Sequence, residues 1–139
     1  MGSKMIAFRL VVLTAVCTGA LAVAQSLDFE IYVTRVQPIF LEKRPGHARC
    51  VVCHEANNSA FRLQPLSPGS AKWTEAQSHL NFESVSHLVK PGNPTASKLF
   101  MHPLSPDSGG DEFHGGGRQF ASQDDPDWKI IAEWVRQAR

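Results

Sequence analysis

The chain has 139 residues, three cysteines and a formal net charge of +1 at pH 7; 42% of its residues are hydrophobic and 19% are charged. This length and balance suit one compact domain. The chain lacks the basic excess that a nucleic-acid-binding surface needs, so we expect no nucleic-acid partner.

Residues 1–24 have the order of features found in a signal peptide. Lys4 and Arg9 supply positive charge, residues 10–24 form an uncharged, mostly apolar run, and Ala22-Val23-Ala24 is a small-x-small cleavage site. We therefore expect an exported, periplasmic protein whose mature domain spans residues 25–139. If the segment were retained, it would anchor that domain to the membrane, facing the periplasm, although the apolar run is short for a membrane span.

The first predicted helix lies between Asp28 and Phe40, where apolar residues recur at three- and four-residue steps. Pro38 should kink or restart this helix, because proline has no backbone N–H to donate. Residues 43–49 follow, with Pro45-Gly46 in the middle, and predict a basic loop.

Residues 50–54 read Cys-Val-Val-Cys-His and match the Cys-x-x-Cys-His sequence that attaches c-type haem. In a turn of helix, Cys50, Cys53 and His54 fall on the same face. The two thiols can then form thioethers with the haem vinyl groups, and the imidazole of His54 can bind the iron as the proximal ligand. The motif therefore predicts one covalently bound haem c as the cofactor. Attachment of such haem outside the cytoplasm agrees with the signal peptide.

Three other interpretations of the cysteine pair fit less well. A zinc site needs four protein ligands, and residues 25–139 contain no second cysteine pair. A thioredoxin-like motif belongs at the start of a helix after a strand, in an alternating β/α pattern that does not surround residues 50–54. A disulfide between such close residues would close a very short loop and stabilise little.

The basic loop before the motif supplies Lys43, Arg44 and Arg49. These side chains are candidates for docking a partner or for binding a haem propionate. A plain solvated loop is the alternative interpretation.

After the motif, residues 55–72 are rich in Asn, Ser, Pro and Gly and predict an irregular loop that wraps the haem. Thr74 begins a capping box, and apolar residues follow at helical spacing until Pro91 ends the helix. Asn93 should cap a short helix over residues 94–101.

The last part of the chain combines a glycine-rich loop with a helix. Five glycines lie within residues 109–117 and allow the backbone to approach something closely. Asp125 should then cap a C-terminal helix that begins with a proline and has an acidic first turn. The predicted buried face of that helix consists of Ile130, Ile131, Trp134 and Val135.

The chain resembles a small monohaem c-type cytochrome of the class I cytochrome c fold, and is especially similar to planctomycete-type cytochrome c-like domains. The resemblance extends over nearly all of the mature chain, and its stretches are residues 36–40, 50–54, 88–94, 97–99 and 131–135. It implies an all-α fold in which the N- and C-terminal helices pack across a covalently bound haem, with long connecting loops. Many relatives carry a Met-Pro-Pro ligand loop before the last helix. This chain has Phe-His-Gly-Gly-Gly at 113–117 instead, similar to a His-Gly-Gly subgroup.

The distal ligand of the iron is expected in that glycine-rich loop, where the family places it. His114 is the first candidate, which predicts bis-histidine ligation with His54. Met101 and His102 are the alternatives; the former would give the Met/His pair usual in electron-carrying cytochromes c. An iron with no distal protein ligand is a further alternative. The other histidines, His47, His79 and His87, are less well placed.

Two functional classes follow from these residues. The first is a one-electron carrier, not an enzyme, in which two axial side chains hold the iron and the haem edge exchanges electrons with redox partner proteins. The second is a haem enzyme or small-molecule sensor, peroxidase-like, with a displaceable distal ligand and an acid or base above the iron. One haem motif and a ready internal ligand favour the carrier.

Overall fold

Helices make up the regular structure of the protein in the computed structural model, which describes residues 26–55 and 59–138. In chain order they are α1 (Phe29–Ile31), η1 (Tyr32–Val36), η2 (Gln37–Phe40), α2 (Cys50–His54), α3 (Glu75–Ser86), η3 (Pro94–Ala96), α4 (Lys98–Met101), η4 (Pro106–Ser108) and α5 (Pro126–Arg136). Within the described ranges the only strand-like pairing is an isolated bridge between Leu104 and Phe120. The prediction of an all-α fold is confirmed. The predicted signal peptide lies outside the described residues.

The first helical stretch is continuous from α1 through η1 to η2, but its winding changes along the way. Asp28 caps its start by accepting a hydrogen bond from the Ile31 N–H at 2.8 Å. The backbone then widens into the π-helix η1, where the Gln37 N–H donates to the Tyr32 carbonyl, and tightens into the 3₁₀ helix η2 around Pro38. Since proline cannot donate and its ring crowds the preceding turn, the change of winding at this position is expected. The predicted interruption at Pro38 is confirmed.

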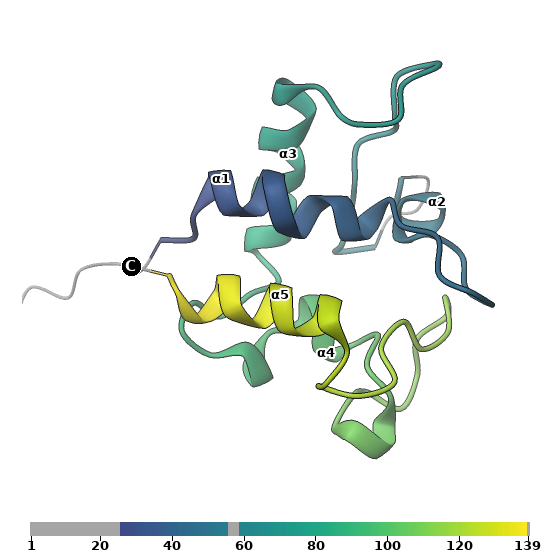
Figure 1. Ribbon diagram of the computed structural model, residues 1–139, viewed down its shortest axis with the longest axis vertical. Coiled ribbons are helices and arrows are strands. Elements are labelled where there is room, and N and C mark those ends of the chain that lie inside the picture. The colour runs from purple at the N-terminus through teal and green to yellow at the C-terminus, as the bar shows by residue number, and fades with distance from the viewer. Residues whose placement is uncertain (1–25, 56–58, 139) are drawn as a thin grey trace, which may run out of the picture.

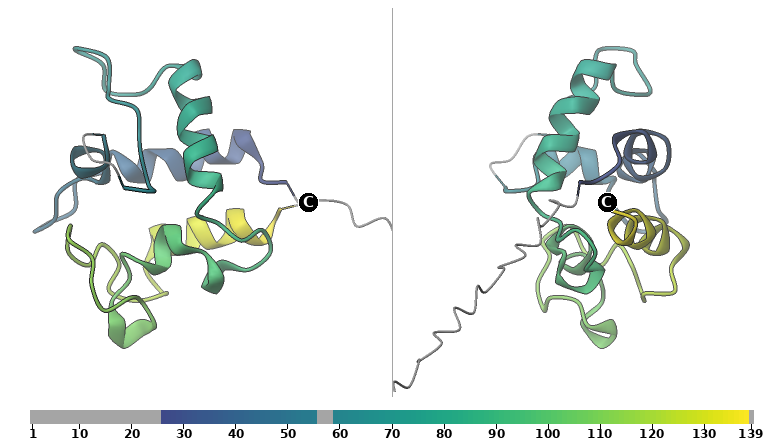
Figure 2. Two further views of the ribbon diagram at one scale, coloured as in Figure 1. Left: turned by 180° about the vertical axis from the view of Figure 1, so that it is seen from behind. Right: turned by 90° about the vertical axis from the view of Figure 1, so that its left-hand side faces the viewer.

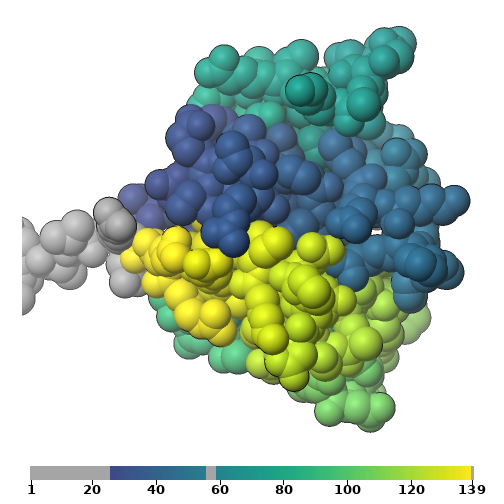
Figure 3. Space-filling model, viewed as in Figure 1, coloured from purple at the N-terminus to yellow at the C-terminus, as the bar shows by residue number. Residues whose placement is uncertain are grey.

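The first helical stretch and α5 lie side by side and run in opposite directions, and α3 crosses steeply beside them (Figure 1). The same arrangement is visible from behind and end-on in Figure 2. On the face shown in Figure 3, the atoms of these two helical segments are in direct contact. Trp134 joins them, because its ring packs 5.7 Å from that of Tyr32 and its Nε1–H donates to the Asp28 carbonyl at 2.8 Å.

The buried face of α5 differs slightly from the predicted one. Trp128 and Ala132 are buried together with Ile131, Trp134 and Val135, whereas Ile130 is only partly buried. Asp125 caps the helix as predicted, accepting hydrogen bonds from the N–H groups of residues 127 and 128.

Two helices end earlier than their sequence patterns predict. α3 stops at Ser86 instead of reaching Pro91, because the Leu88 carbonyl accepts a hydrogen bond from the Leu99 N–H and the Lys90 N–H donates to the Ser97 hydroxyl. The predicted helix over residues 94–101 is divided into η3 and α4, since Ser97 is fully buried in an extended conformation. Tertiary hydrogen bonds thus replace helical ones. In the described part of the chain, no helix is both long and apolar enough to cross a membrane.

Candidate functional site

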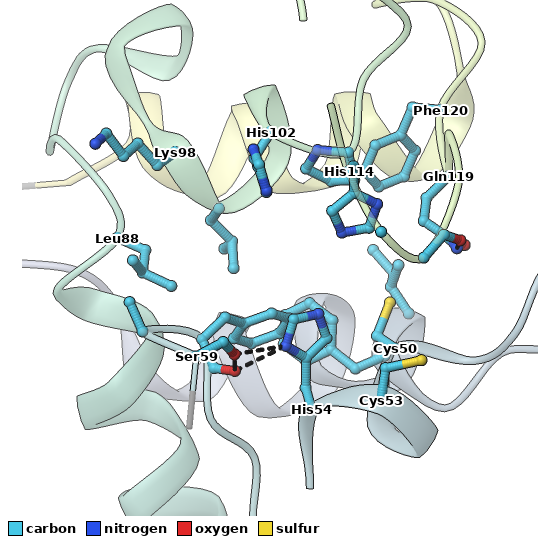
Figure 4. A pocket seen from close by; sticks show the side chains of 18 of the residues that line it. Cys50, Cys53, His54, Ser59, Leu88, Lys98, His102, His114, Gln119 and Phe120 are labelled. Atoms are coloured by element: carbon cyan, nitrogen blue, oxygen red, sulfur yellow. Dashed lines mark hydrogen bonds between the residues drawn. The ribbon is translucent and has the colours of Figure 1, made fainter. Parts of the chain in front are cut away.

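A cavity of about 530 Å³ opens at the end of the molecule where α2 lies, and its walls come from both halves of the chain. Its volume is in the range of about 300–1,000 Å³ that is common for small-molecule and cofactor sites. Apolar side chains such as Phe40, Phe61, Leu99 and Ile131 line much of it. Figure 4 shows the polar groups that face it, with His54 on one side and His102 and His114 on the other.

The helix α2 brings Cys50, Cys53 and His54 to one edge of this pocket, as the spacing predicts. Both cysteines are free thiols. The Cys50 sulfur turns toward the pocket, while Cys53 is exposed at its outer edge (Figure 4). Burial raises the pKa of the Cys50 thiol to about 11, although the nearby Arg44 charge acts in the opposite direction. In the closed pocket this thiol is therefore protonated and a weak nucleophile.

His54 is held by its Nδ1 atom, which donates to the Phe61 carbonyl at 2.8 Å and lies 3.1 Å from the Ser59 hydroxyl. A carbonyl only accepts, so Nδ1 must carry the proton of the neutral ring and Nε2 keeps a free lone pair. Burial lowers the pKa of His54, which favours this neutral form; the Phe61 hydrogen bond opposes the shift and the charges of His114 and His102 add to it. Such anchoring through the second nitrogen is typical of a metal-ligating histidine.

His114 is anchored in the same way by its own loop. Its Nδ1 atom donates to the Gly117 carbonyl at 2.5 Å, and the Gly117 N–H returns a hydrogen bond to the His114 carbonyl at 3.0 Å. Gly117 has φ of +79°, a region that favours glycine, and a Cβ at Gly116 would lie 3.1 Å from the His114 ring. The glycines therefore allow the chain to turn closely around this imidazole.

The two anchored imidazoles face each other across the pocket. Their ring centroids are 6.4 Å apart and their planes differ by 18°. Metal–imidazole bonds are ~2.0 Å long, so two rings that bind one metal from opposite sides have centroids several ångströms apart. A nitrogen of each ring faces the space between them in Figure 4. The near-parallel rings and their spacing are compatible with two ligands of one metal ion.

The alternative distal candidates take different positions. His102 lies at the end of α4, lines the pocket and meets His114 edge-on, with ring centroids 5.0 Å apart. Its Nδ1 atom donates to the Asp111 carboxylate at 2.7 Å. Met101 is not among the side chains that line the pocket and packs against the core instead.

The three less favoured histidines do not line the pocket either. His79 stacks on Phe29 with a centroid distance of 4.0 Å, at the other end of the first helical stretch. Among residues 26–55 and 59–138, no three His, Cys, Asp or Glu side chains form a group that could hold a metal ion alone. Two protein ligands suffice where a cofactor supplies the others, as haem does.

The basic side chains of the loop before Cys50 take different positions, and one of them, Arg44, forms ion pairs that its sequence does not indicate. Arg49 lines the pocket and Lys43 is exposed, so both remain candidates for their predicted roles. Arg44 is instead engaged with Asp125 and Asp127 at the start of α5, and its side chain is only 17% exposed. Its guanidinium is thus paired within the protein, which leaves it less available for docking a partner than the side chains of Lys43 and Arg49.

Comparison of the chain with protein-family models, with curated proteins and with solved structures finds no match.

Proposed function

We propose that this chain is a c-type cytochrome that carries single electrons. It would hold one haem through thioethers at Cys50 and Cys53, with His54 and His114 as axial ligands of the iron. The observation that carries the proposal is the opposition of two anchored imidazoles, 6.4 Å apart, in a pocket edged by the Cys-x-x-Cys-His helix. The antiparallel packing of the first and last helices supports the class I cytochrome c fold as the finer description.

Each group in the pocket has a definite task under this proposal. A bound haem would supply the one-electron chemistry. The Phe61 and Gly117 carbonyls orient the two ligand rings, and because neither ring needs to turn, reorganisation between states is small. Apolar walls exclude water, and Arg49 and Lys98 are the cations that line the pocket and can face haem carboxylates.

The proposal extends to location and partners. The chain would act after export, in the periplasm, and would exchange electrons with redox partner proteins at the open side of the pocket. Docking guided by surface charge should slow as salt rises.

Covalent haem is the first test. Denaturing mass spectrometry of protein made in a host with c-haem maturation should give the polypeptide mass plus one haem. Cys50→Ser and Cys53→Ser should each remove one thioether, and the double variant should lose its haem to acid–acetone extraction. Extraction of the haem from the wild-type protein would contradict the proposal.

The identity of the distal ligand is the second test. With His114 on the iron, the oxidised protein should be low-spin and lack the far-red sulfur-to-iron charge-transfer band of Met/His cytochromes, and its potential should be lower than theirs. His114→Ala should change the spectrum and Met101→Ala should not. A far-red band that disappears in Met101→Ala would identify the methionine as the ligand instead.

One observation supports the second candidate function, a haem enzyme or sensor. His102 and Asp111 form a hydrogen-bonded pair on the distal side of the pocket, an arrangement that could move a proton above an open iron. Carbon monoxide distinguishes the two functions. A carrier with His114 bound should take it up slowly or not at all in the ferrous state, whereas rapid stoichiometric binding or sustained peroxide turnover would favour the enzyme or sensor.

A further inference from the structure

Arg44 connects three separate segments of the chain beside the pocket. Its Nη1 atom donates to the Gln119 carbonyl and to the Asp125 carboxylate, each at 3.1 Å, and its Nη2 atom donates to the Asp127 carboxylate. The guanidinium also lies 4.9 Å from the centroid of the Phe120 ring. One side chain thus links the loop before Cys50, the end of the glycine-rich loop and the start of α5.

The Gln119 side chain extends this linkage to the two ligand-bearing loops. Its Nε2 atom donates to the Gly116 carbonyl at 3.2 Å and to the Ala48 carbonyl at 3.4 Å. Gly116 is two residues after His114, and Ala48 is two residues before Cys50. The loops on the two sides of the pocket are therefore joined through residue 119, whose backbone Arg44 holds.

The side chains of this cluster are mostly shielded from water, which strengthens the electrostatic contacts between them. Gln119 is 9% exposed, and the paired side chains of Arg44, Asp125 and Asp127 are 17–19% exposed. Ion pairs at such depth are screened less by salt than surface pairs, and removing the cation would leave two half-buried carboxylates facing each other. A guanidinium can bond both carboxylates and a carbonyl at once, whereas a lysine ammonium has no such planar fork.

We propose that Arg44 is a positioning residue that holds the His114 loop against the Cys50–His54 helix, and so sets how readily His114 leaves the iron. This inference rests on the proposed function. Among the described residues, the His114 imidazole donates from Nδ1 to the Gly117 carbonyl of its own loop and meets the His102 ring edge-on. The position of the loop therefore influences where its Nε2 points. The Arg44–Gln119 contacts fix that loop from the proximal side of the pocket.

The test compares four variants of the haem-loaded protein. Arg44→Gln removes the charge, Arg44→Lys keeps the charge but not the fork, and Gln119→Ala removes the side-chain links to both loops. Arg35→Gln is the matched control, since Arg35 forms an ion pair with Glu133 at 3.0 Å in which both side chains are about half exposed and neither lines the pocket. Carbon monoxide association with the ferrous protein reports release of the distal ligand. Amide hydrogen exchange over residues 112–120 reports loop opening without depending on the iron.

We expect Arg44→Gln to accelerate carbon monoxide binding about tenfold, which corresponds to the loss of a buried, charge-assisted contact. Hydrogen exchange over residues 112–120 should rise with it. Gln119→Ala should act in the same direction, Arg44→Lys should fall between the wild type and Arg44→Gln, and the control should stay within about twofold of the wild type. If Arg44→Gln fails to fold, Arg44→Lys and Gln119→Ala carry the same comparison.

One result would contradict the inference: the Arg44 and Gln119 variants lose thermal stability, while their carbon monoxide association rates and their hydrogen exchange over residues 112–120 equal those of the control. That result would assign Arg44 a structural role only. Failure of the proposed function is visible separately in the wild-type protein. If the wild-type protein lacks covalent haem or binds carbon monoxide at once, the proposal of an electron carrier is contradicted. If the wild type and the variants all bind carbon monoxide equally slowly, only the role of Arg44 is contradicted.

Discussion

Gly110 lies so close to the Leu104 backbone that it has no room for a side chain. A Cβ added at this position would lie 2.0 Å from the Leu104 carbonyl oxygen and 2.5 Å from its carbonyl carbon. Gly110→Ala must therefore push the glycine-rich loop away from the segment after α4, and we expect it to lower the free energy of unfolding by at least about 2 kcal/mol. Denaturant unfolding of the haem-loaded protein measures this loss.

Gly115→Ala is the control within the same loop. A Cβ there would meet no protein atom within 4 Å, and Gly115 is not among the glycines with positive φ. Because Gly115 lines the pocket, the two variants are compared at equal haem content. Its effect should stay within about 0.5 kcal/mol. Equal losses in the two variants would show that the close approach at Gly110 does not limit stability.

At this scale the sequence predicts most of the candidate site. Cys50, Cys53 and His54 lie in one helix, where their spacing puts them on the same face, and His114 lies across the pocket from His54; their roles as ligands stay predictions. The groups that orient these ligands could not be predicted, since the partner of His54 is a backbone carbonyl at Phe61, which every residue type supplies. The Asp111 partner of His102 and the buried pairing of Arg44 were also missed, because both depend on how loops fold back in space and no spacing rule marks them.

Thr74 shows how much one side chain contributes to a whole helix. Its hydroxyl accepts from the Gln77 N–H, and the Gln77 side chain accepts from the Thr74 N–H, so α3 begins with the predicted capping box. Thr74→Ala should cost about 1 kcal/mol of unfolding free energy, because an N–H at the helix start loses its partner. The same substitution inside a helix, Thr34→Ala, should be neutral or stabilising by up to ~0.7 kcal/mol, given the better helix propensity of alanine. Equal destabilisation by both would rule out capping as the cause.

The ends of helices are harder to predict from local sequence than their starts. The starts of α3 and α5 follow from capping residues that act within one turn, and both were predicted. The end of α3 and the break at Ser97 were not predicted. There the Leu99 N–H donates to the Leu88 carbonyl and the Lys90 N–H donates to the Ser97 hydroxyl, across the turn at residues 88–99. A helix cap can be predicted from sequence because its donor and acceptor are close neighbours in the chain. A tertiary hydrogen bond cannot, because its partners are far apart in the chain.

Four helical segments of the molecule contribute to the walls of one cavity of about 530 Å³. Apolar walls from the first helical stretch, α2, α4 and α5 meet there, and without a cofactor they would face water. We therefore expect protein made without haem to be largely unfolded, with little helical far-ultraviolet circular dichroism and no cooperative melting, while the haem-loaded protein has both. A haem-free protein with a native-like spectrum and a sharp transition would contradict this expectation.

The hydrogen bond from Trp134 to the Asp28 carbonyl joins residues 106 positions apart. It can therefore form only late in the synthesis of the domain. A chain synthesised from its amino end presents Asp28 and both thiols well before Trp134, and the first helix cannot pack on α5 until α5 has been made. During that interval Cys50 is in water, where its thiol ionises normally; once the molecule closes, burial raises its pKa to about 11 and suppresses the thiolate. If Cys50 carries the proposed haem, the haem therefore has to be attached before the molecule closes. The haem-free chain should accordingly alkylate at Cys50 and Cys53 at similar rates, and a much slower Cys50 would mean that the pocket closes without its cofactor.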